Sequence, residues 1–591
     1  MNTEEFQNQI NNRIPLITKG QGAFLGAAIG DALGWPQELE AKRIDKNSFS
    51  VAEVLENGFQ QWERKSGGQY YPHEEIIQAG EYSDDTQLIL CTGRSLLYGN
   101  QWWHQLTKLE LPIWTYYERG GGGATKRAAK SWLWEIEPWL SKDKKRYFDA
   151  GGNGAAMRIL PHCIVGAKET SFAKIAKNIV ANSVTTHGHP RALLGALAYG
   201  FAVWLALRQT NTLEYGAIID KVFSEVNSWS LLPDLNDICP TWKNSALEVS
   251  YGKYDDNWKV TVKEMLQLLE KCQEGMKEGA LSIEKEILTQ LGCFNKSIKG
   301  AGTVSAAAAI FLASRFAANP FQGIIEAGFA EGSDTDTIAS MTGGILGALA
   351  GIEWLRNYKN KVQDANYLKQ LAEHLAKNQN RSQTKQADNR KVTKNTANLL
   401  IVNINKLNIG DNITFPDGRQ ANLSSIINHN SLSKSTIATS RKLLTADGQS
   451  LYFKKLSRLK NDPKANFQLK AVNVVNIGVK LLVRDMNVAR FFYEKVLGLK
   501  VEKESKNAVR CGCIVLVPIS PKENTLQSLN NSNQKNPERI YLEVASLDEV
   551  YSNVRQFEAK IVRDIYEREE RRSFLCLDPD DNMVEILEIK F

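Results

Sequence analysis

Apolar and small residues recur at helical spacing through the first 375 residues of the chain, as in Arg191 to Leu207 and Ala306 to Phe316. Runs that alternate apolar and polar positions, as half-buried strands do, are few in this part. Residues 1–375 are therefore predicted to form an all-α domain. Near its start, a helix of small residues is expected to end before Pro36 and to leave Glu38 on a loop.

The pattern changes after a polar stretch. Residues 376–398 carry six basic residues and a single acidic one, so a solvated linker is predicted, with a nucleic-acid-binding arm as the alternative. Residues 399–470 alternate in short segments around Pro416-Asp417-Gly418 and Ala446-Asp447-Gly448, which is typical of β-hairpin turns. A small β-rich unit of unknown role is expected there.

The last part of the chain, residues 475–591, repeats one arrangement of elements. A strand at Val479–Val483 and a helix at Val488–Leu497 precede further strands, and a strand at Ile540–Val544 and a helix at Leu547–Phe557 begin a second copy. Two β-α-β-β-β repeats predict one duplicated α+β domain. The chain as a whole is predicted to be a multidomain protein.

Composition narrows the class of protein but does not indicate which reaction or ligand it has. The chain has 591 residues, enough for about three folded units, and its 43% hydrophobic and 24% charged residues are ordinary for soluble protein. Met1 to Gly20 lacks an apolar targeting segment, and Val304 to Ala318 is too short to span a bilayer. The eight cysteines are scattered and are interpreted as reduced thiols, so we expect a cytoplasmic protein with no membrane partner. The net charge of +7 is mild and does not exclude nucleic acid as a partner.

Two acidic clusters lie roughly 250 residues apart, Tyr82 to Thr86 and Gly332 to Ala339. Carboxylate and hydroxyl oxygens are the ligands that Mg²⁺, Mn²⁺ and Ca²⁺ prefer, and four aspartates supply enough charge for two such ions. The alternative is that each cluster caps a helix, since Ser, Thr and Asp favour helix N-termini; the two roles are compatible. The candidate oxygens belong to Ser83, Asp84, Asp85, Asp334, Asp336 and Thr337.

Two glycine-rich segments, Gly120 to Thr125 and Gly151 to Arg158, lie between the acidic clusters. Such segments let backbone N–H groups approach a phosphate, although they also occur for packing reasons. His187, in Thr186 to Pro190, offers a polar contact or is a structural histidine. The candidate substrate-binding residues are Gly122, Gly123, Asn153, Gly154, Ala155, Met157, Arg158 and His187.

The order of these motifs resembles the ADP-ribosylglycohydrolase family, from Gly20 to about Leu375. The resemblance implies an all-α fold with a binuclear Mg²⁺ or Mn²⁺ centre, held by the six residues named above for the acidic clusters. It implies that Asn153 to Arg158 binds ADP-ribose and that Glu38 gates or assists catalysis. Ser83 departs from the family pattern, where Thr is common, and Ser333 stands where Gly is usual.

The implied reaction removes ADP-ribose from a modified protein. Cleavage of a glycosidic bond needs a rigidly held sugar, an activated water and a protonated leaving group; Asp85 or Asp336 is the expected base. Because a guanidine readily takes a proton, we expect an N-linked arginine rather than a serine. The alternative is a binder without turnover, such as an immunity protein that blocks an ADP-ribosyltransferase toxin.

The C-terminal repeat resembles the glyoxalase, bleomycin-resistance and dioxygenase superfamily in Asp485 to Leu499 and Asp578 to Ile586. Its members usually bind a metal through His and Glu, but the last of the seven histidines here is His429, and Glu585 alone matches a ligand. A metal-free module that binds a small molecule, recruits a protein or dimerises is therefore expected.

Overall fold

The computed structural model divides the chain into two compact units, Met1–Leu459 and Lys460–Phe591. Most of the first unit is described, and shorter stretches of the second. The described residues are 14–38, 51–210, 214–279, 284–378, 390–458, 474–483, 486–491, 501–505, 508–511, 514–518, 539–556, 560–568, 571–577 and 583–588.

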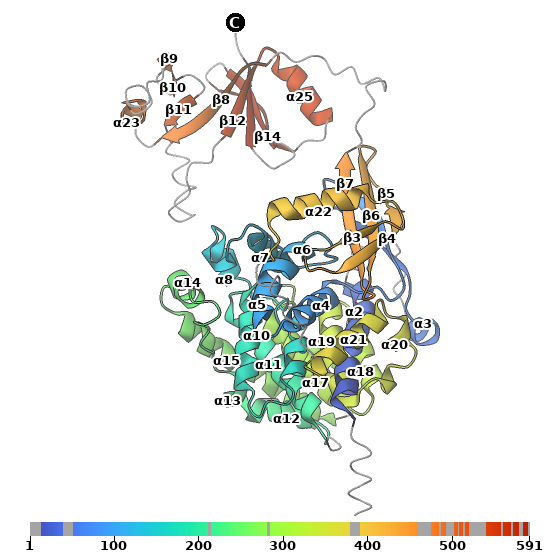
Figure 1. The fold of residues 1–591 in the computed structure, drawn as a ribbon. Helices are drawn as coiled ribbons and strands as arrows, with labels where there is room; N and C mark the ends of the chain where they lie inside the picture. Colours follow the sequence, from blue (N-terminus) through green and yellow to red (C-terminus); the bar gives the residue numbers. More distant parts are fainter. Residues whose placement is uncertain are drawn as a thin grey trace, which may run out of the picture. The chain divides into compact units, whose positions relative to one another are not determined.

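Helices build the first unit up to Ala376, as the apolar periodicity predicted (Figure 1). At its centre lie four almost completely buried helices: α2 (Leu16–Glu38), α11 (Pro190–Arg208), α17 (Gly302–Arg315) and α19 (Thr335–Ala350). By length and composition α11 could cross a membrane, but 89% of its apolar window is buried in the unit, as in a core helix. The other helices are α3 (Val51–Asn57), α4 (Asp84–Leu96), α5 (Trp102–Gln105), α6 (Leu111–Trp114), α7 (Gly123–Leu133), α8 (Lys144–Phe148), α9 (Leu160–Val165), α10 (Ala173–Val184), α12 (Ala217–Ser224), α13 (Val226–Trp229), α14 (Trp242–Val249), α15 (Tyr254–Lys277), α16 (Glu284–Leu291), α18 (Pro320–Gly328), α20 (Tyr358–Lys361) and α21 (Ala365–Ala376).

Helices α2 and α19 pack with their backbones in close approach. Four glycines repeat every fourth residue along α2, and a Cβ built on any of them would lie 2.1–2.4 Å from a carbonyl oxygen of α19 or of Gly351 just after it. Only glycine fits at such a distance. The close approach fixes the first turn of α19 beside the last turns of α2. The four glycines are Gly22, Gly26, Gly30 and Gly34.

Replacing Gly26 by Ala is expected to lower the free energy of unfolding by about 3 kcal/mol, because the new methyl group would meet the carbonyl oxygen of Gly343 at 2.3 Å. Urea denaturation of the full chain measures the change. Gly20→Ala is the matched control on the same helix, since its Cβ would meet Ile164 at an ordinary 3.5 Å. An equal effect of both substitutions would contradict the packing described for α2.

Two short strands interrupt the helical part and were not predicted. β1 (Trp62–Ser66) and β2 (His73–Ile77) form an antiparallel hairpin, and β5 (Asn430–Ser431), from the middle of the chain, pairs with β2 as a third strand. The middle segment is thereby hydrogen-bonded to the helical body.

The middle segment forms an antiparallel sheet in the order β3 (Asn412–Thr414), β4 (Gln420–Asn428), β6 (Thr436–Thr445) and β7 (Ser450–Arg458). Both predicted hairpin turns are confirmed. Gly418 and Gly448 adopt φ values of +87° and +96° there, a region that favours glycine.

One prediction for this segment was wrong, because residues 399–406 are helical. They belong to α22 (Lys394–Lys406), whose start is capped by the Thr393 hydroxyl. Ala397, Leu400 and Ile404 are its buried residues, and their spacing of three and four positions is that of a helix face. The boundaries at 375, 398 and 470 stay predictions, and residues 379–389 of the expected linker lie outside the described range.

The second unit contains the predicted duplicated α+β fold. β8 (Val474–Val483) and β12 (Arg539–Val544) pair antiparallel at the centre of an eight-stranded sheet, and the last strand of each repeat, β11 (Ile514–Pro518) or β15 (Met583–Glu588), runs parallel to the first. The remaining elements are α23 (Met486–Phe491), β9 (Val501–Ser505), β10 (Ala508–Cys511), α25 (Leu547–Gln556), β13 (Ile561–Arg568) and β14 (Arg571–Leu577).

Candidate active site

The two acidic clusters are both helix N-termini, and they meet. Ser83 caps α4 by accepting a hydrogen bond from the backbone N–H of Asp85 at 3.3 Å, and Asp334 precedes the first residue of α19. The Thr337 hydroxyl of α19 donates to Asp85 Oδ2 of α4 at 3.3 Å. Segments 252 residues apart in sequence therefore face one another across one site.

Glu38 reaches the same site from a helix and not from the predicted loop. α2 continues through Pro36 and includes Glu38. A proline in the last turn removes only one N–H donor, and the close packing of α2 on α19 supports the helix beyond it. Oxygen atoms of Glu38, Asp334 and Asp336 all lie within 4.8 Å of one another.

Asp31 is a further acid of the site that the sequence analysis did not select. Its buried carboxylate accepts hydrogen bonds from the N–H of Ser83 at 2.9 Å, the N–H of Thr86 at 3.0 Å and the hydroxyl of Thr86 at 2.6 Å. Burial raises its pKa, although the hydrogen bonds from Thr86 and Ser83 oppose that shift. Asp31 therefore fixes the start of α4. An acid between two glycines of a small-residue helix was the available signal.

Without a bound cation, it is unfavourable for all the aspartates of the cluster to carry a negative charge at once. Burial, and then neighbouring acids, raise the pKa values of Asp84, Asp85 and Asp336 well above the ordinary range. In the described part of the chain, none of these three carboxylates forms an ion pair with a lysine, arginine or histidine. Carboxylates this close in a buried site need a cation to be ionised together.

The donor set fits a hard divalent cation. Asp85 Oδ1 is buried and has no hydrogen-bond partner among the described atoms, so it is free either to bind a metal or to accept a proton. The candidate ligand atoms are all oxygens, which Mg²⁺ and Mn²⁺ prefer. Asp336 Oδ1 accepts a hydrogen bond from the backbone N–H of Thr337 at 2.8 Å.

The Asn153 loop touches the acids directly. Asn153 donates through Nδ2 to Asp334 Oδ2 and to Ser305 Oγ, both at 3.0 Å, and its backbone N–H donates to Gly300 O at 2.9 Å. The loop runs into a short 3₁₀ turn, Ala156–Arg158, which leads into α9. Ala155, just before the turn, and Met157, within it, are both buried.

Arg158 is hydrogen-bonded to the Asn153 loop from the protein interior. Its guanidinium is completely buried and donates to Gly154 O at 2.6 Å and to both oxygens of Asn182, and burial lowers its pKa to about 9. This arrangement braces Gly154. Direct substrate binding by Arg158 stays a prediction.

His187 lies against the other side of Gly154. A Cβ on Gly154 would come within 2.9 Å of Thr125 Oγ1 and 3.1 Å of the His187 ring. Burial, with Arg158 nearby, lowers the pKa of His187 to about 3, so the imidazole is neutral at physiological pH. The Thr186 hydroxyl hydrogen-bonds to its Nδ1 at 2.7 Å.

The second glycine-rich loop also borders the acids. Gly120 has φ +101°, and a Cβ on it would lie 3.1 Å from Asp84 Oδ1. Gly122 is the N-cap of α7, which begins at Gly123, and the first N–H groups of a helix have no partner within that helix. Both loops predicted to bind phosphate therefore lie beside the carboxylates.

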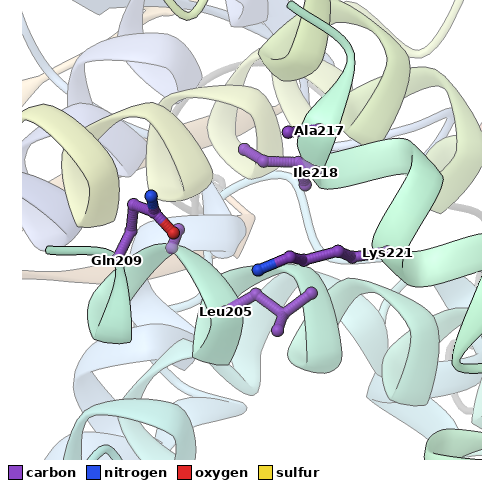
Figure 2. Close-up of a pocket in the computed structure, with 6 residues that line it drawn as sticks. Leu205, Gln209, Ala217, Ile218 and Lys221 are labelled. Carbon is purple, nitrogen blue, oxygen red and sulfur yellow. The ribbon is translucent and has the colours of Figure 1, made fainter. Parts of the chain in front are cut away.

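A small cavity elsewhere in the first unit is a different feature. It has a volume of about 10 Å³ and lies between the end of α11 and the start of α12, as Figure 2 shows, with Leu205, Gln209, Ile218 and Lys221 in its lining. None of its lining residues is acidic, so it is not part of the candidate active site.

In the second unit, Glu585 is the residue for which the sequence resemblance implies a metal ligand, and its side chain is bound by other side chains of the protein. Glu585 is buried, and its Oε1 accepts from Arg563 Nη2 and from the Tyr566 hydroxyl, both at 3.3 Å. The guanidinium of Arg563 lies 3.7 Å from the centre of the Tyr566 ring. The absence of a metal from this module stays a prediction.

Family models match both parts of the chain in which the sequence showed a resemblance. Residues 13–385 match the ADP-ribosylglycohydrolase family model and residues 477–589 match the glyoxalase-like domain model. A solved ADP-ribosylglycohydrolase-related protein complex covers 62% of this chain and 99% of its own, at 18% identity and a TM-score of 0.39. A glyoxalase/bleomycin resistance protein/dioxygenase superfamily member from Vibrio splendidus 12B01 covers 20% of this chain and 100% of its own, at 17% identity and a TM-score of 0.15.

Two curated proteins match part of the first unit. ADP-ribosylarginine hydrolase Tri1 of Serratia proteamaculans (strain 568) is 24% identical over 216 residues, which is 35% of this chain and 50% of that protein. ADP-ribosyl-[dinitrogen reductase] glycohydrolase of Rhodospirillum rubrum is 27% identical over 183 residues, 30% of this chain and 54% of that protein. The chain thus spans about half the length of the curated relatives it matches. With the family model covering most of its length, the chain belongs to the ADP-ribosylglycohydrolase family and carries a glyoxalase-like domain near its C-terminus.

Proposed function

We propose that the first unit is a divalent-metal-dependent hydrolase that removes ADP-ribose from a modified protein by cleaving the N-glycosidic bond to arginine. The observation that carries the proposal is the buried cluster of Asp84, Asp85 and Asp336, which forms no ion pair within the described chain. Membership of the family supports hydrolysis, and a relative named as an ADP-ribosylarginine hydrolase supports arginine as the acceptor.

The six oxygen-bearing residues of the two acidic clusters, with Glu38 beside them, would hold two cations, Mg²⁺ or Mn²⁺. Such ions supply Lewis acidity toward water and toward the hydroxyls of the ribose. Binding them also offsets the repulsion among the aspartates, which is the reason the protein tolerates so many buried acids in one place.

The protein's own groups would orient the sugar and move the proton. Asp85 is our choice of base, because its Oδ1 is buried without a hydrogen-bond partner and can accept a proton from an attacking water. Asp336 is the second candidate. Asn153, fixed by Asp334, holds the loop whose N–H groups would contact the ADP-ribose phosphates, and the start of α7 would do so from the other side.

The acceptor can be tested with matched substrates. We expect free ADP-ribose from a protein modified on arginine and at least about tenfold less from one modified on serine, because the guanidine leaves with a readily gained proton whereas an alkoxide needs an acid. Chromatography of released ADP-ribose in the presence of Mg²⁺ measures both rates. A faster release from serine would contradict the proposed acceptor while leaving hydrolysis intact.

A further inference from the structure

The middle segment is joined to the helical body through β5, which lies between β4 and β6 in the chain and is the third strand of the β1-β2 hairpin. β5 pairs with β2 through Asn430 and Ser431, which oppose Glu74 and His73. The side chain of Asn430 also donates to Glu74 Oε2 at 2.6 Å. These contacts hold the sheet at one position on the helical body.

A buried group of charges lies beneath this junction. Arg64 pairs with Glu75 at 2.8 Å and Arg119 pairs with Glu81 at 2.8 Å, and no side chain of the four is more than 9% exposed. Both guanidinium groups lie over the ring of Trp35, at 4.9 and 5.5 Å from its centre. Buried charges of this kind are costly unless every member has partners.

Strand β7 supplies further partners for the carboxylates of this buried group. Lys454 Nζ pairs with Glu75 Oε2 at 2.8 Å, and the Tyr452 hydroxyl donates to Glu81 Oε1. The Arg119 guanidinium lies 4.4 Å from the centre of the Tyr452 ring. Arg119 thus contacts an aromatic ring of the helical body, Trp35, and one of the middle sheet, Tyr452.

Arg119 leads directly into the loop over the candidate metal ligands. Its backbone N–H donates to Gln87 Oε1 at 3.2 Å. At Gly120, the next residue, an added Cβ would lie 3.1 Å from Asp84 Oδ1 and 3.4 Å from Trp35 Nε1. The loop then reaches Gly122 and the start of α7. A shift of Arg119 would therefore move the segment that covers Asp84.

A second path joins β7 to the same cluster. The N–H of Ser450, at the start of β7, donates to Asp364 Oδ2 at 3.0 Å. The hydroxyl of Tyr82 donates to that same oxygen at 2.6 Å, and Tyr82 immediately precedes Ser83. The sheet therefore contacts both segments that carry the α4 end of the site.

We propose that β7 is a positioning element of the active site, in which Tyr452 and Lys454 hold Glu81 and Arg119 and thereby the loop from Arg119 to Gly122 over Asp84. The kinetic part of this inference rests on the proposed function, because it assumes that the loop binds the substrate. The middle sheet is then a necessary part of the hydrolase and not an independent module.

The kinetic test compares full-length variants at β7. Tyr452→Leu and Lys454→Met are expected to raise KM for the ADP-ribosylated protein by about tenfold while kcat changes less, because the binding loop and not the reacting carboxylates is displaced. Tyr452→Phe, which keeps the ring under Arg119, should recover most of the loss. Lys455→Met is the matched control, since Lys455 is the exposed neighbour on the same strand.

Hydrogen exchange supplies a readout that does not need activity. In Tyr452→Leu and Lys454→Met, the amides of residues 118–123 should exchange about tenfold faster than in the unaltered protein and in Lys455→Met. If Tyr452→Leu fails to fold, Lys454→Met decides the question. Unchanged exchange of residues 118–123 in the folded Leu or Met variants overturns the inference whatever the kinetics, whereas an inactive unaltered protein overturns the proposed function alone.

Discussion

Asp336→Asn is expected to reduce ADP-ribose release by at least about a thousandfold, because the amide removes one negative charge and one ligand oxygen from a cluster that is proposed to bind two cations. Asp336 lies in the first turn of α19 with an oxygen within 4.8 Å of those of Glu38 and Asp334. Asp84→Asn should have a similar effect. Initial rates with ADP-ribosyl-arginine protein measure the loss.

The control separates lost chemistry from lost structure. Without metal, Asp336→Asn should unfold at the same temperature as the unaltered protein or a higher one, since it relieves repulsion from Glu38 and Asp85. Glu331→Gln removes a charge from an exposed position shortly before α19 and should leave the rate unchanged. Full turnover by Asp336→Asn would contradict the proposed site.

Removing divalent metal should make the stability of the protein fall as pH rises. Burial and neighbouring acids raise the folded-state pKa values of Asp84, Asp85 and Asp336, so the folded chain binds more protons than the unfolded chain above about pH 4. The extra protons stabilise the folded state. This stabilisation is fully present below the pKa that the aspartates have in the unfolded chain, and it is lost as the pH rises through their higher pKa values in the folded chain. Thermal unfolding in excess chelator between about pH 5 and pH 8 measures the loss.

Adding Mg²⁺ should reverse this trend. A ligand at about one hundred times its Kd stabilises the folded state by about 2.7 kcal/mol, and deprotonated aspartates bind the cation best, so the gain should be largest at the higher pH. Asp336→Asn should show a shallower pH slope and a smaller gain. A metal-free protein that becomes more stable as pH rises would contradict the electrostatics described for the cluster.

Many residues of the candidate site could be selected from the sequence because their side chains are typical both of helix N-termini and of metal ligands. Ser83 and Asp334 stand at helix starts, where capping residues are expected, and the same oxygens are candidate metal ligands. Their meeting across the site was implied only by the resemblance to the family. The contact that joins them, Thr337 to Asp85, depends on the close approach of α2 and α19, which periodicity alone does not specify.

The features missed from the sequence depend on partners distant in the chain. The sequence of β1, Trp-Glu-Arg-Lys-Ser, has too many charged residues to predict a partly buried strand. The strand is stable here because Arg64 pairs with Glu75, a carboxylate that also binds Lys454. Asp31 looked like part of a packing helix because the groups it binds lie more than fifty positions later. The continuation of α2 through Pro36 likewise follows from its packing on α19.

The most direct test of the central proposal is the release of free ADP-ribose by the metal-depleted full chain from an arginine-modified protein, before and after addition of Mg²⁺ or Mn²⁺. The account predicts no release without metal, release when either ion is added, and loss of release with excess chelator. Binding of ADP-ribose without release, or release that persists in chelator, would contradict it.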